Sequence, residues 1–239
     1  MGSIKRVQRT SSVEAAPAPP VSSFEKVTEA ELETHLAVAK YGQFVLTDAI
    51  RPSYDLKVIP TAGYRFDSYK DPETGSVVPV IMASASREVL FDIFLEMLEP
   101  LGEEVDVVLE TSHTRGSQGH VDLYREHIDL PVLKSMLCDY ENLLMNDGCT
   151  GIAVLNPGIP QEVQFDEHKL IIAYGKPLDR FEEILQSFGL ERDDQLRFLT
   201  EAEHVHSSND KLFNEFDELR MRLGMDAEVV CDDEDAMGV

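Results

Sequence analysis

The sequence predicts an α/β protein, with α+β as the alternative, in which helices flank a mixed β-sheet. Apolar residues make up 43% of the 239 residues and charged residues 28%, a composition that supports a packed core. Apolar side chains recur at helical spacing in five segments, and short β-branched or alternating runs lie between them. No stretch is long and apolar enough to cross a bilayer. These patterns predict a mixed sheet with helices packed on it.

Five helices are expected, each with an apolar stripe and a start or stop signal. Thr28 and Glu31 form a capping-box pattern before the first helix, and Pro177 opens the fourth. The same pattern recurs at 200–203 and predicts that the last helix begins there. The expected helices span residues 29–40, 87–99, 133–146, 177–189 and 200–224.

Seven strands are expected, and residues 67–76 are predicted to form a surface loop. Pro79 interrupts the third strand, which predicts that this strand lies at a sheet edge or starts after the proline. Helices alternate with strands in the first half, which favours a parallel component, whereas the last three strands are too close for crossovers and should pair antiparallel. The expected strands span residues 43–47, 56–60, 77–83, 105–109, 152–155, 162–166 and 169–174.

The two ends of the chain differ from the middle in composition. Residues 1–24 are rich in Ser, Ala and Pro, lack the apolar core of a signal peptide, and are predicted to form a disordered arm. Residues 225–239 carry only acidic charges and are predicted to form a solvated tail. Residues 25–224 are expected to form one domain, with 191–224 as a candidate helical extension.

The formal net charge is −24, from 21 basic and 45 acidic residues. Nucleic acids and anionic membranes attract proteins with a basic face, so this balance predicts that the protein binds neither. A protein is the expected partner. The net charge does not indicate whether the protein is a monomer or an oligomer.

The three cysteines, Cys138, Cys149 and Cys231, include no CxxC pair, which argues against a disulfide framework and a cysteine-rich zinc site. Cys138 and Cys149 fit small buried side chains in a reducing compartment, and the expected location is the cytoplasm. Cys149 follows the turn Asp147-Gly148 and is a conceivable nucleophile, but the sequence identifies no partner for it.

The segment 111–130 is the first candidate site, because it follows a predicted strand and concentrates imidazole and guanidinium groups. Its histidines, with Asp122 and Asp129 nearby, could ligate a metal, and its arginines could clamp a carboxylate or phosphate. No metal-site spacing such as HExxH is present, so no metal is predicted, and a solvated polar loop is the plainer interpretation. The candidate ligand-binding residues are His113, Arg115, His120, Arg125 and His127.

His204 and His206 lie beside Glu201 and Glu203 and also invite a metal interpretation. Residues two apart on a helix point in different directions, so one ion cannot easily reach both rings. Chelation would require an extended backbone. Because a helix is expected here, the favoured interpretation is a solvated helical face.

Two functions remain open at this stage. The chain contains no P-loop, no GxGxxG, no GxSxG and no HExxH, so no cofactor is predicted. The favoured function is a non-catalytic protein-binding or regulatory module of acidic, chaperone-like or adaptor-like character. The alternative is an enzyme or a small-ligand or metal-binding protein that uses the segment 111–130.

Overall fold

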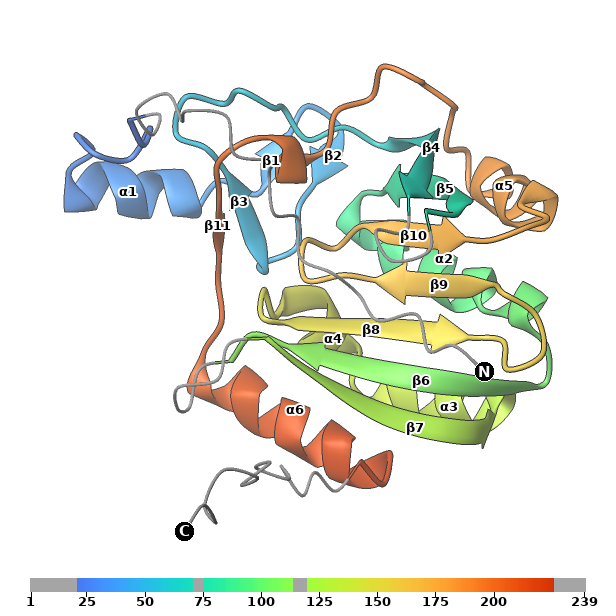
Figure 1. Ribbon diagram of the computed structural model, residues 1–239. Coiled ribbons are helices and arrows are strands. Elements are labelled where there is room, and N and C mark those ends of the chain that lie inside the picture. Colours follow the sequence, from blue (N-terminus) through green and yellow to red (C-terminus); the bar gives the residue numbers. More distant parts are fainter. Residues whose placement is uncertain (1–20, 71–74, 114–119, 226–239) are drawn as a thin grey trace, which may run out of the picture.

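The protein is described by a computed structural model over residues 21–70, 75–113 and 120–225. It consists of a large sheet with helices packed on one face, which confirms the predicted combination of helices and sheet (Figure 1). No helix in these ranges is both long enough and apolar enough to cross a membrane. Most of the predicted arm and tail lies outside these ranges, but Ser22 and Ser23 are described and hydrogen-bond to Glu203.

The main sheet has seven strands, and every one of its ladders is antiparallel. The predicted parallel component is therefore wrong, for a topological reason. Strands β7 and β8 are joined by helices and run in the same direction, but β6 lies between them and pairs with both. The strand order is β4 (Gly63–Lys70), β5 (Val77–Ser84), β10 (Ile171–Tyr174), β9 (Glu162–Phe165), β8 (Thr150–Leu155), β6 (Glu104–Thr111), β7 (Val121–Asp129).

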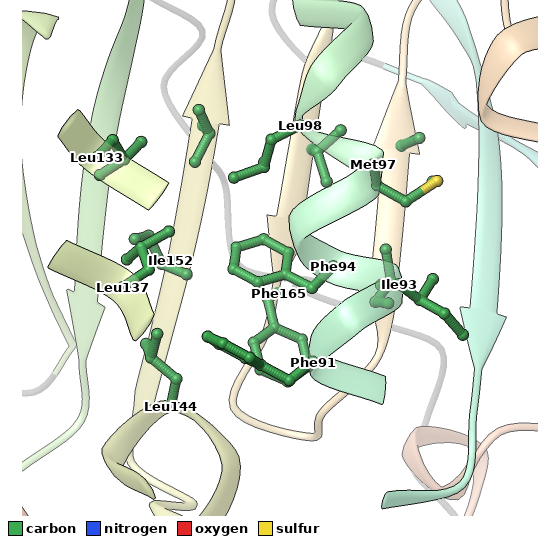
Figure 2. Close-up of a cluster of buried hydrophobic side chains, with 14 of the residues drawn as sticks. Phe91, Ile93, Phe94, Met97, Leu98, Leu133, Leu137, Leu144, Ile152 and Phe165 are labelled. Atoms are coloured by element: carbon green, nitrogen blue, oxygen red, sulfur yellow. The ribbon is translucent and has the colours of Figure 1, made fainter. Parts of the chain in front are cut away.

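The core lies between this sheet and its helices. Phe94 of α2 stacks on Phe165 of β9 with ring centroids 4.9 Å apart, and both side chains are almost fully buried (Figure 2). Leu133, Leu137 and Ile152 continue the same apolar layer. The packed helices are α2 (Arg87–Met97), α3 (Leu130–Asp139), α4 (Glu141–Asn146) and α5 (Asp179–Ser187), and α6 (Asp210–Arg222) packs on α4.

Smaller elements lie at one end of the sheet, where β9 ends and β8 and β10 begin (Figure 1). Among them, β11 pairs antiparallel with β3, so the last part of the chain lies against an early segment. Short 3-10 helices, η1 (Glu99–Leu101) and η2 (Leu199–Glu201), complete the fold. The smaller elements are α1 (Glu29–Leu36), β1 (Lys40–Tyr41), β2 (Phe44–Val45), β3 (Ile50–Pro52) and β11 (His204–His206).

Several predicted elements differ from the structure. Strands β4 and β7 were expected to be loops, and the expected strand at 56–60 does not form. The strand with Pro79 is not at an edge, since β5 lies between β4 and β10; the proline falls just beyond the β10 ladder, which ends at Val80. The last helix begins at Asp210, where Asn209 caps it, and β11 precedes it.

Candidate metal site

Three histidines meet at the end of the sheet. His168 lies in the turn between β9 and β10, and His204 and His206 are the two end residues of β11. Residues two apart on a strand face the same way, so both β11 rings point to the same side. The three ring centroids are 4.7 to 5.0 Å apart. One ligand nitrogen of each ring lies within 4.8 Å of those of the other two.

The Nδ1 atom of each ring is held by an acceptor. His204 Nδ1 lies 2.8 Å from the Ala202 carbonyl oxygen, and His206 Nδ1 lies 2.6 Å from that of Gly148. A carbonyl oxygen can only accept, so both Nδ1 atoms must carry the proton. His168 Nδ1 lies 2.9 Å from the Asp166 carboxylate and donates to it.

These contacts leave Nε2 of each ring as the nitrogen available to a ligand. Within the described ranges, no hydrogen-bond partner faces Nε2 of His168, His204 or His206. Metal-bound histidines characteristically donate their other nitrogen to a carboxylate or carbonyl, which fixes the ring and its tautomer. All three rings have that arrangement, so these three residues could hold a metal ion.

The groups around the cluster shift the pKa values of its histidines and hold the His168 ring in place. Burial opposes the charged form of His168, but the hydrogen bond and the negative charge of Asp166 outweigh it and raise the pKa of His168. The Asp166 carboxylate also accepts from the backbone N–H groups of His168 and Leu170, and its pKa is lowered. Burial lowers the pKa of His206, and the neighbouring histidines lower it further. His206 therefore favours the neutral form that a metal ligand needs.

Lys169 is an unusual neighbour of the cluster. It is 5% exposed, and its Nζ donates to the Thr150 carbonyl oxygen at 2.9 Å. Burial lowers the pKa of Lys169 to about 8, although nearby carboxylates act in the opposite direction. Its backbone is left-handed, with φ of 62°, a conformation that costs free energy for a residue with a side chain. Strain and a buried charge in one turn are typical of functional sites.

Gly148 allows β11 to approach the sheet. A Cβ atom at this position would lie 2.3 Å from the Ala49 carbonyl oxygen and 2.9 Å from the Ser207 nitrogen. Glycine is thus required for the backbone bonds from Gly148 to Ser207 and from Ser207 to Ala49, both 2.8 Å. These bonds place His206 opposite His168.

A narrow pocket opens beside His168 and Lys169. Including its open mouth it encloses about 430 Å³, and its other walls are mainly apolar. Arg197 and Thr61 are among its few polar lining residues. The pocket borders the turn that carries His168, whereas His204 and His206 are not among its lining residues.

A second group, formed by His113, Asp147 and Cys149, is organised differently. His113 Nδ1 faces the Thr111 hydroxyl at 2.8 Å, and its Nε2 lies 3.2 Å from Asp147 and 3.0 Å from the Ser208 hydroxyl. Both ring nitrogens are therefore engaged, and burial raises the pKa of the Cys149 thiol. This arrangement anchors the β6–β7 hairpin to the rest of the fold and leaves no nitrogen for a metal.

The residues predicted as a site in segment 111–130 are not gathered together by the structure. His113 lies at one end of the β6–β7 hairpin, and His127 lies at the other end, 63% exposed and bonded to Glu104. His120 pairs with Asp122 at 3.1 Å, and Arg125 is exposed on β7. Arg115 lies outside the described residues.

The sequence contained one usable signal for the actual cluster. His204-Val205-His206 alternates imidazole with a β-branched residue, which is a strand pattern with both histidines on one side. The neighbouring capping-box pattern outweighed it and led to the prediction of a helix, which is wrong. Nothing in the sequence linked His168 to this pair, because a contact across 36 residues depends on the folded sheet.

Comparison with known protein families, with curated proteins and with solved structures finds no match to this chain.

Proposed function

We propose that this protein binds one divalent transition-metal ion, with zinc as the reference ion, through the Nε2 atoms of His168, His204 and His206. The observation that carries the proposal is the orientation of the three rings, each with its Nδ1 proton bonded outward and its Nε2 lone pair available. Imidazole nitrogen suits zinc, copper, iron and nickel.

The distances support binding with a small adjustment. Ligand atoms of a tetrahedral zinc site lie ~3.3 Å apart, since each zinc to nitrogen bond is about 2.0 to 2.1 Å. One ring nitrogen of each histidine lies within 4.8 Å of those of the other two, so the nitrogens must approach one another by up to about 1.5 Å to reach this spacing.

The test is a competition titration of the untagged protein with zinc against a chromophoric chelator. We expect one tight site per chain, and affinity weakened at least tenfold in His204→Gln and in His206→Gln. The matched control is His127→Gln, an exposed histidine outside the cluster, which should bind as wild type does. Equal zinc affinity in wild type and in both cluster variants would refute the proposal.

Thermal unfolding provides a second measurement. A ligand that binds only the folded state stabilises it by about 2.7 kcal/mol when its concentration is one hundred times the dissociation constant. Zinc should therefore raise the melting temperature of wild type and of His127→Gln, but not that of His204→Gln. A rise of equal size in all three proteins would point to zinc bound elsewhere.

The protein-binding function remains a second candidate. The observation that favours it is the sheet face opposite α2 to α5, where Tyr124 is 60% exposed beside the carboxylates of Asp122 and Glu162. Such a face suits a basic segment of a partner protein. A basic peptide should then bind with an affinity that falls as salt rises, and Tyr124→Ala should weaken binding.

A further inference from the structure

The number of protein ligands at the histidine cluster determines what else a bound metal could hold. Structural zinc sites are completed by four protein ligands, whereas catalytic sites have three protein ligands and one position for water or substrate. Within the described residues, the group that shares these distances contains three histidines and no fourth His, Cys, Asp or Glu. The cluster therefore belongs to the three-ligand class.

The nearest carboxylates do not supply the fourth ligand. Asp166 accepts from His168 Nδ1 and from two backbone N–H groups, so both of its oxygens are engaged. Glu167 shares a further group with Asp166 and His168, but its Oε1 lies 3.9 Å from His168 Nδ1, the ring nitrogen that is already committed to Asp166. Asp147 and Cys149 belong to the separate group with His113.

Charge and access favour an external ligand. Three neutral imidazoles leave the full double positive charge on the metal, and an anion in the fourth position would reduce it. The His168 side chain is 17% exposed and borders the narrow pocket, so solvent and small ions reach the cluster.

We propose that the metal held by His168, His204 and His206 keeps an open coordination position, filled by water and exchangeable for a small monoanion such as azide. The inference rests on the proposed function and extends it from holding a metal to presenting a reactive position. A small monoanion is the ligand class considered, because it offsets the metal's charge and needs little space.

The test uses full-length protein loaded with cobalt(II), whose visible absorption depends on its coordination. We expect cobalt to bind at one equivalent per chain, and azide to change the visible spectrum in a saturable way. The His127→Gln control should respond as wild type does. In His204→Gln the response to azide should disappear together with tight cobalt binding.

The outcomes separate this inference from the function on which it depends. Failure of cobalt and zinc to bind tightly would overturn the metal site itself. Tight cobalt binding with a spectrum that azide leaves unchanged would overturn only the open position. A response to azide that is absent in wild type and gained in Glu167→Gln would also overturn it, since Glu167 would then be the fourth ligand.

Discussion

Asp166 has a role at the cluster beyond its own charge. Its carboxylate fixes the His168 ring through Nδ1 and fixes the turn through two backbone N–H groups. A carboxylate that accepts from a metal-bound histidine also makes that ring a stronger ligand. His168 should thus lose affinity for the metal when Asp166 loses its charge.

We expect Asp166→Asn to weaken zinc affinity about 10- to 100-fold, the usual effect of removing such an outer partner. Competition titration measures the change. Glu167→Gln is the matched control, because Glu167 makes no hydrogen bond to the cluster within the described residues, and its affinity should stay close to wild type. Equal losses of zinc affinity in both variants would mean that the negative charge near the cluster, rather than the hydrogen bond from His168 to Asp166, strengthens zinc binding.

Asp147 predicts a dependence of stability on pH. Its side chain is fully buried; burial alone would raise its pKa, but hydrogen bonds with His113, Ser208 and Thr150 lower it. A carboxyl whose pKa is lower in the folded state stabilises the fold above its unfolded value, near 3.9, and this contribution is lost as pH falls through the folded value.

The variant Asp147→Asn should therefore lower the free energy of unfolding at pH 7 by about 1 to 3 kcal/mol, because His113 loses a charged partner. The difference in unfolding free energy between variant and wild type should narrow below about pH 4, where the carboxyl of the unfolded wild-type chain takes up a proton that the folded chain does not yet bind. Urea unfolding between pH 3 and pH 7 measures both. A difference in unfolding free energy that stays constant from pH 7 to pH 3 would contradict the lowered pKa of Asp147.

At the scale of elements, the position of β11 depends on one glycine. In Gly148→Ala the new methyl group would collide with the Ala49 carbonyl oxygen. We expect a loss of about 1 to 3 kcal/mol in stability, as for other overpacked positions. Zinc affinity should fall too, since Gly148 supplies the acceptor for His206.

Gly158→Ala is the control for this prediction. Gly158 lies in an exposed turn, and the nearest atom to an added Cβ is 3.4 Å away. Stability and zinc affinity should therefore both change little in Gly158→Ala. A Gly148→Ala protein that melts and binds zinc as wild type does would mean that β11 can approach the sheet in another way.

Helices were easier to predict from the sequence than strands. Local signals mark helix ends, and the capping box at Thr28 and the apolar stripe of 87–99 correspond to α1 and α2. Strand β7 carries Val121 and Leu123 at alternating positions, but its charged residues suggested a loop. Partners for strands lie far away in the chain, so neither the sheet order nor the convergence of His168 with β11 could be read locally.

At the scale of the whole molecule, the core can be tested apart from the cluster. Phe94 stacks on Phe165, whose ring also lies 5.4 Å from Lys169 Nζ, but among the described residues Phe94 makes no ring contact with the three histidines. We expect Phe94→Ala to cost about 3 to 5 kcal/mol of stability. Below its melting temperature the variant should still bind zinc with wild-type affinity; loss of binding in the folded variant would show that the cluster depends on core packing.

The net charge of −24 governs the molecule's long-range interactions. Like charges repel, so we expect no measurable affinity for duplex DNA or for anionic vesicles at physiological salt. Fluorescence anisotropy and vesicle sedimentation test this. Micromolar binding that weakens with added salt would reveal a basic patch.

The pairing of β11 with β3 has a consequence for the order of folding during synthesis. Positions 204–206 leave the ribosome more than 150 residues after positions 50–52, so β3 waits for its partner strand until β11 has been synthesised. Contacts this distant in sequence carry a high loop-closure cost and form late. A nascent chain that ends after α5 lacks His204 and His206, two of the three imidazoles. Tight zinc binding by a nascent chain would therefore show that β11 has been synthesised and has paired with β3.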